Sequence, residues 1–148
     1  MRILVWLIGT GLALAAAPGG RVEYIGGTVE SLTTKADGRM NTADVDKLVV
    51  QFRNKDLTVP FERINQLEYG QKVDRRYLSA VLISPIFLLA KSRKHFLTVG
   101  YQDAAGRQQA MIFRVAKGDI RALLVTLEAR TGRKVIFQDE EARKAGKG

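Results

Sequence analysis

The spacing of apolar residues changes once along this chain, and that change most constrains its fold. Between residues 22 and 101, short apolar runs alternate with polar residues, as Leu48, Val50 and Phe52 do. A period of two is typical of half-buried strands. After residue 119 the period becomes about 3.6, which is typical of an amphipathic helix. We therefore expect a mainly β (α+β) domain, an antiparallel barrel or sandwich of about seven strands with one C-terminal helix.

Two pairs of runs predict hairpins. Residues 47–52 and 57–61 flank one polar turn, and residues 95–102 and 107–115 flank another. Pro60 lies in the first pair and has no N–H to donate, so its strand should be at an edge of the sheet. Further strands are predicted at residues 28–32, 39–42 and 66–71, with a turn at 36–38 and a tight turn at 62–64.

The predicted helix carries signals at both of its ends. Asp119 is placed to cap the N-terminus, and Gly132 is placed to adopt the left-handed conformation that ends many helices. One face of the helix is apolar and should close the β core. That face consists of Ile120, Leu123, Leu124 and Leu127.

The beginning of the chain has the three parts of a secretory signal. Arg2 precedes an apolar run over residues 3–14, and the small residues Ala15, Ala16 and Ala17 follow. The run is short for a membrane span, which needs about 20 apolar residues. The sequence therefore favours a signal peptide over residues 1–17 and an exported, periplasmic or cell-envelope protein, with an uncleaved anchor as the alternative.

Export predicts a processed N-terminus. We expect the mature chain to begin after Ala15 or Ala17, because small residues precede both positions. Mass spectrometry of the protein from its native cell checks this. A chain that still begins at Met1 and remains in the cytoplasm would contradict export.

The composition restricts the partners and cofactors that the protein can use. The chain has 24 Lys and Arg residues against 15 Asp and Glu residues, a net charge of +9, which favours anionic partners such as phospholipid headgroups or nucleic acid. No aromatic or base-reading group alternates with the basic residues in a known pattern, so nucleic acid is not expected. The chain has no cysteine, which excludes disulfides and thiolate metal sites.

Three stretches resemble the bacterial pleckstrin-homology-like (PH/GRAM-like) domains, including those of uncharacterised exported proteins with a central apolar insert. The stretches are residues 24–28 (YIGGT), residues 59–70 (VPFERINQLEYG) and the hairpin with helix at 95–130. The resemblance covers residues 22–138 and implies a non-catalytic adaptor in which Ile64 fills the core. Only Lys35 and Arg39 lie where phosphoinositide-binding relatives place several basic residues, so that ligand is not expected.

The residues that could carry catalysis are sparse. His95 is the only histidine, and it lacks a second nitrogen ligand for a zinc site. No carboxylates pair convincingly for acid–base work. Ser79, Ser84 and Ser92 could complete a hydrolase with His95, but none lies in a nucleophile elbow. We therefore expect no enzyme activity and no cofactor, and a hydrolase is the third alternative.

An uncharged apolar insert interrupts the strand pattern at residues 77–90. It could pack on the domain, form a dimer contact or dip into a membrane, and these alternatives remain open. As a straight helix it would reach only about 21 Å, short of the hydrocarbon core of about 30 Å. Pro85 divides it into two halves, so a bent hairpin is the better shape.

The sequence thus predicts a non-enzymatic binding module that lies peripherally on a membrane surface. The rival is an assembly or protein-interaction domain whose insert packs internally or in an oligomer. Residues 139–148 are charged and are expected to form a flexible tail. The predicted membrane contacts are Leu82, Ile83, Ile86, Phe87, Leu88 and Leu89, and the predicted contacts to anionic headgroups are Arg75, Arg76, Lys91, Arg93 and Lys94.

Overall fold

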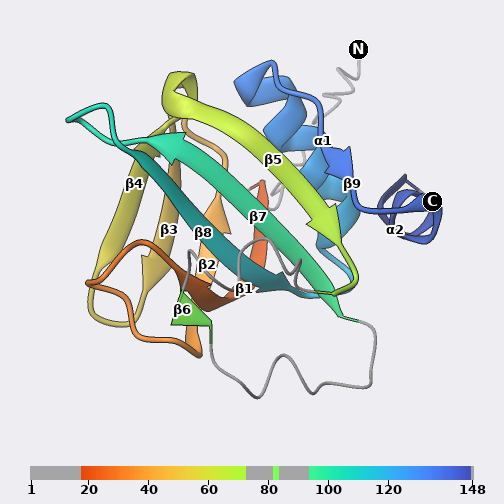
Figure 1. Cartoon of the computed structure of the whole chain (residues 1–148), viewed down its shortest axis with the longest axis horizontal. Helices are drawn as coiled ribbons and strands as arrows, with labels where there is room; N and C mark the ends of the chain where they lie inside the picture. Colours follow the sequence, from red (N-terminus) through yellow and green to blue (C-terminus); the bar gives the residue numbers. More distant parts are fainter. Residues whose placement is uncertain (1–17, 73–81, 84–93, 148) are drawn as a thin grey trace, which may run out of the picture.

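The computed structural model describes residues 18–72, 82–83 and 94–147, and in these residues the chain is mainly β (Figure 1). One mixed sheet of nine strands is accompanied by two α-helices and a short 3-10 helix. The strands are β1 (Gly19–Gly27), β2 (Ala36–Asn41), β3 (Lys47–Phe52), β4 (Asp56–Pro60), β5 (Ile64–Gly70), β6 (Leu82–Ile83), β7 (His95–Gln102), β8 (Gln108–Val115) and β9 (Ile136–Phe137). The helices are η1 (Phe61–Arg63), α1 (Ile120–Thr131) and α2 (Glu140–Lys147).

The sheet has to curl because of how its strands are connected. Eight strands follow the order β4-β3-β2-β1-β8-β7-β5-β9, and all neighbours are antiparallel except β5 and β9. The first strand of this path, β4, is joined to β5 near its other end only by η1. Three residues span about 10 Å at most, so the two ends of the sheet must approach each other. Pro60 lies in the edge strand β4, as predicted.

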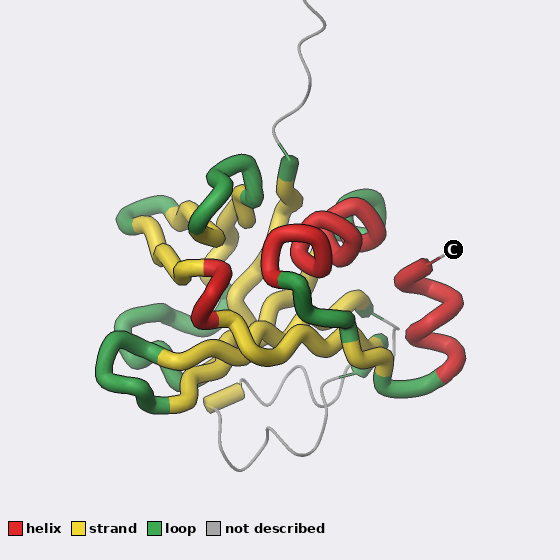
Figure 2. Tube along the Cα trace, turned by 90° about the horizontal axis from the view of Figure 1, so that it is seen from above, coloured by secondary structure: helices red, strands yellow, loops and turns green. Residues whose placement is uncertain are grey.

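The core fills the inside of this curl. Alternate residues of the strands point inward, so Leu48 and Val50 of β3 meet Leu97 and Val99 of β7 in one buried cluster. Ile64 is also buried there. Figure 2 shows α1 lying over the curled sheet. The four residues of its apolar stripe are buried: Ile120, Leu123, Leu124 and Leu127.

The two ends of α1 differ in how they are capped. Gly132 adopts φ 67°, and its N–H donates to the Glu128 carbonyl over 2.9 Å, as predicted. Asp119 occupies the N-cap position without a side-chain cap. Its Oδ2 accepts a hydrogen bond from the Arg21 N–H over 2.8 Å instead. The predicted cap is therefore wrong, because tertiary packing brings β1 within reach of this carboxylate.

The first pair of strands, β1 and β2, lies earlier in the chain than the predicted strands at residues 28–32 and 39–42. The run at residues 28–32 is a connection, and residues 36–38, expected to be a turn, belong to β2. The chain turns with Lys35 at φ 68°. Strand β1 begins at Gly19, ahead of the expected domain start at Val22. Local composition gave the wrong prediction for residues 36–38, because pairing of Gly38 with Phe52 of β3 holds a turn-like sequence in a strand.

The predicted flexible tail is also wrong for residues 140–147, which form α2. Oδ1 of Asp139 accepts the Ala142 N–H over 2.7 Å and so caps the helix. Ala142 is buried, and a Cβ on Gly146 would lie 2.6 Å from the Phe137 ring. These two small residues lie four positions apart and form one face. The short side chains let α2 dock closely on β9 and on Leu124.

Part of the outer face of the sheet is apolar as well. Ile25, Phe96 and Ile112 are buried but do not belong to the main core. They alternate with core residues, so they point away from α1. Strand β6 lies at this part of the sheet, where it pairs with Gly26 and Gly27 beyond the end of β2. The middle of the apolar insert is therefore hydrogen-bonded to β1.

Candidate functional site

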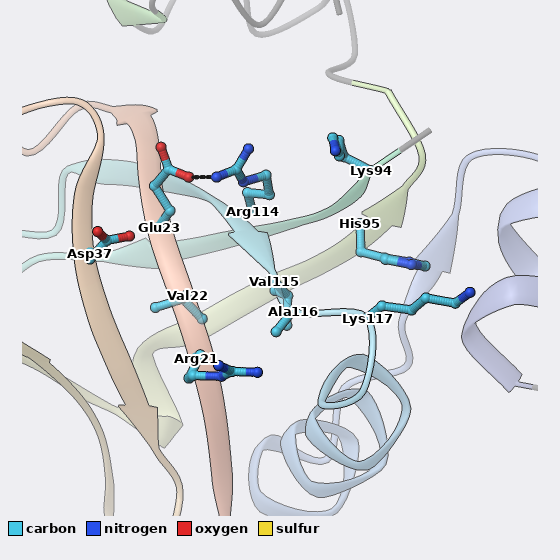
Figure 3. A pocket seen from close by; sticks show the side chains of 10 residues that line it. All are labelled: Arg21, Val22, Glu23, Asp37, Lys94, His95, Arg114, Val115, Ala116 and Lys117. Atoms are coloured by element: carbon cyan, nitrogen blue, oxygen red, sulfur yellow. Dashed lines mark ion pairs between the residues drawn. The ribbon is translucent and has the colours of Figure 1, made fainter. Parts of the chain in front are cut away.

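A shallow basic groove of about 580 Å³ lies where β1, β7 and β8 meet the connection to α1 (Figure 3). We call this surface the basic groove. Its cations come from segments far apart in the sequence, because β8 lies between β1 and β7 in the sheet. The groove is defined by Arg21, Lys94, His95, Arg114 and Lys117, together with the carboxylates of Glu23 and Asp37.

Strand register places these side chains in rows. Glu23 of β1 is opposite Arg114 on one side and Asp37 on the other. These residues alternate with core positions and therefore face outward. The Arg21 carbonyl accepts the N–H of Ala116, one residue past β8, over 3.1 Å. The end of β1 is thereby joined to the connection that carries Lys117.

Only part of the charge in the groove is neutralised internally. Arg114 forms an ion pair with Glu23, which Figure 3 marks with a dashed line. Nε of Arg21 lies 3.9 Å from Oδ2 of Asp119, which makes a second ion pair. Among the described residues, no carboxylate pairs with Lys94 or Lys117. The groove therefore keeps an excess of positive charge and is suited to attract an anion.

His95 is held at one end of the groove by Tyr69. The Tyr69 hydroxyl and Nδ1 of His95 are joined by a hydrogen bond of 2.6 Å. Burial lowers the pKa of His95 below 6.5, and the charges of Lys117 and Arg121 lower it further. Burial raises the pKa of Tyr69 to about 12. At neutral pH the imidazole is therefore uncharged and the tyrosine keeps its proton.

The described residues that flank the apolar insert, Gln71 before it and Lys94 after it, meet beside this groove. The Lys94 N–H donates to the Gln71 carbonyl over 3.4 Å, and Gly70 pairs with Phe96 in the adjoining strands. The chain thus leaves the sheet and returns to it at one place. Lys72 and Lys94, the described members of the basic clusters at residues 72–76 and 91–94, both lie next to this point.

The structure places only some of the predicted site residues. Lys94 lines the groove, and the backbone of Leu82 and Ile83 forms β6. The other predicted membrane and headgroup contacts lie outside the described residues, as do Ser79, Ser84 and Ser92. These unplaced contacts are Ile86, Phe87, Leu88, Leu89, Arg75, Arg76, Lys91 and Arg93.

Sequence reasoning missed most of the groove. It assigned no binding role to Arg21, Arg114 or Lys117. Alternation along β8 does place Arg114 outward, so this residue had a detectable signal. Arg21 and Lys117 had none, because they meet only through strand pairing.

No helix in the described parts of the chain is long and apolar enough to span a membrane. Within residues 18–72 and 94–147, no group of three His, Asp or Glu side chains is arranged to hold a metal ion.

Compared with known proteins, the chain matches no protein-family model, and no curated protein is significantly similar to it in sequence. The chemistry of the basic groove is therefore the basis for a functional assignment.

Proposed function

We propose that this protein is an exported, non-enzymatic binding module that docks on an anionic membrane surface. The basic groove and the basic ends of the insert would contact the phospholipid headgroups. Charge attraction supplies the binding energy, at about 1 kcal/mol for each Lys or Arg near such a surface. The apolar residues of the insert would add shallow insertion into the acyl boundary.

A pleckstrin-homology-like fold is part of this proposal. Seven strands, from β4 along the path to β5, form one antiparallel series, and α1 follows β8 in the chain. This count and order agree with what the sequence resemblance implies. The resemblance implies that such domains commonly act as adaptors, and a surface groove suits a binding role.

One observation carries the membrane assignment, namely that the described residues on the two sides of the insert, Gln71 and Lys94, meet beside the basic groove. The contact between Lys94 and Gln71 puts Lys72 and Lys94, one residue from each basic cluster, on the same side of the domain. A spanning segment would instead separate the clusters across a bilayer. A bent hairpin would leave both clusters beside the same anionic surface.

Flotation with vesicles tests the proposal. The chain beginning at Pro18 keeps the whole core, which extends from Val22 to Ala142. We expect it to float at low salt with phosphatidylcholine vesicles that contain phosphatidylglycerol, and not with phosphatidylcholine alone. Lys94→Glu/Lys117→Glu should weaken binding by roughly tenfold or more, because two attractive charges become repulsive.

The matched control reverses two charges elsewhere. Arg133 and Lys134 follow the far end of α1, about 18 Å along the helix from Lys117. Arg133→Glu/Lys134→Glu changes the net charge equally, and its binding should stay much closer to that of the wild type. If both double variants lose binding equally, or the wild type does not float, the groove is not the docking surface.

A second candidate function is a protein-interaction domain whose insert packs on its own sheet. Pairing of β6 with β1 and the buried outer-face residues Ile25, Phe96 and Ile112 favour this candidate. The double variant Ile86→Asp/Phe87→Asp distinguishes membrane insertion from a packed insert. Loss of flotation by this folded variant supports insertion, whereas equal flotation leaves charge attraction alone and favours a packed insert.

A further inference from the structure

A second hollow of about 720 Å³ adjoins the basic groove and shares His95 and Lys117 with it. Its other polar side chains are Gln71 and Arg121. We propose that this hollow binds a single phosphate group. The inference rests on the proposed function and deepens it, because it names the headgroup chemistry that the domain would recognise.

The charge around the hollow suits a phosphate. Lys117 and Arg121 supply two cations, and no carboxylate lines the space. Among the described residues, neither cation forms an ion pair with an Asp or Glu. Nε of Arg121 donates to the Ala145 carbonyl over 3.3 Å, which positions the guanidinium at the hollow. Ammonium and guanidinium groups are the donors that phosphate oxygens prefer.

His95 adds a neutral donor to these two cations. Because the Tyr69 hydroxyl keeps its proton, it can donate to Nδ1 over the 2.6 Å that joins them. The ring proton then resides on Nε2, which becomes a hydrogen-bond donor. Figure 3 shows the His95 and Lys117 side chains extending in the same direction. One imidazole, one ammonium and one guanidinium thus line the same space.

The hollow is also continuous with the basic groove. Shared residues make the two surfaces continuous, so a headgroup phosphate in the hollow would leave Arg21 and Lys94 next to neighbouring lipids. A phosphomonoester presents three acceptor oxygens and fits three donors better than a phosphodiester does. Lipids with a terminal phosphate should therefore be preferred over phosphodiester lipids of equal charge.

The imidazole of His95 is a direct reporter, since the chain has only one histidine. We would follow its NMR signals in the chain beginning at Pro18 while adding inorganic phosphate at constant pH and ionic strength. A saturable shift is expected. Lys117→Gln and Arg121→Gln should each weaken phosphate binding about tenfold, the effect of losing one charge-assisted hydrogen bond. Arg133→Gln, which lies outside the hollow, should bind phosphate like the wild type.

Binding to vesicles distinguishes a lipid phosphate from a soluble phosphate as the ligand of the hollow. At matched surface charge, vesicles with phosphatidic acid should bind more tightly than vesicles with phosphatidylglycerol, and Lys117→Gln should remove the difference. The phosphate site is overturned, even if the protein floats, when His95 shows no saturable shift or when the three Gln variants show equal shifts. A saturable shift without any flotation instead keeps the site, assigns it to a soluble phosphate and overturns the membrane proposal.

Discussion

Replacing Leu124 with Asp should unfold the domain. The side chain is 3% exposed and lies in the stripe with which α1 closes the core. Removing most of a buried leucine costs about 2–5 kcal/mol, and an unpaired carboxylate in the same place adds a further desolvation cost. Small domains are stable by only about 5–15 kcal/mol in total. We expect loss of the cooperative thermal transition.

The adjacent residue supplies the control. Val125 is 66% exposed on the same helix, so Val125→Asp introduces the same charge without burying it. Its melting temperature should stay within a few degrees of that of the wild type, because exposed substitutions change stability by about 0.5 kcal/mol or less. Similar melting temperatures for the two variants would show that α1 does not close the core.

Gly27→Ala should produce the second large loss of stability. A Cβ at this position would lie 2.3 Å from the Ala110 carbonyl oxygen and 2.6 Å from the Tyr24 hydroxyl. The carbonyl belongs to the backbone of β8 and cannot rotate away, so the two strands must separate. Overpacking of this kind costs about 1–3 kcal/mol. Because Gly27 also pairs with Leu82 of β6, the change would disturb the attachment of the insert.

The same substitution at Gly118 is the matched control. A Cβ there has no atom within 4 Å, and the residue does not have a positive φ. Gly118→Ala should be neutral or should stabilise the protein by about 0.4–1 kcal/mol, because it restricts the unfolded chain. Urea unfolding measures both variants. Equal effects at the two positions would mean that β1 and β8 are not packed as closely as described.

The local pattern of the sequence was enough to predict those elements whose structure depends only on nearby residues. The alternation in residues 47–61 and 95–115 predicted two hairpins, and both form, as β3 with β4 and as β7 with β8. The 3.6-residue period likewise marked the buried stripe of α1. In each case the pattern depends on residues within a few positions of one another, so it can be read without knowing the fold.

The prediction failed where partners distant in the sequence decide the outcome. Residues 36–38 have a turn-like composition but form a strand, because β1 pairs with all three and β3 pairs with Gly38. Residues 140–147 have the composition of a solvated tail, yet Ala142 is buried and Gly146 packs against Tyr69, Leu124 and Phe137. That surface is assembled by the fold and leaves no trace in the local pattern.

The sequence by itself determined the secondary-structure class, the excess of positive charge and the presence of an apolar insert between basic clusters. Only the tertiary structure decided where that charge gathers. Asp119 accepts a hydrogen bond from Arg21, 98 positions away in the chain, and the same end of the sheet collects Lys94 and Lys117. The physical reason is that alternation sets which face a side chain takes, while strand register and the curl of the sheet set which side chains meet.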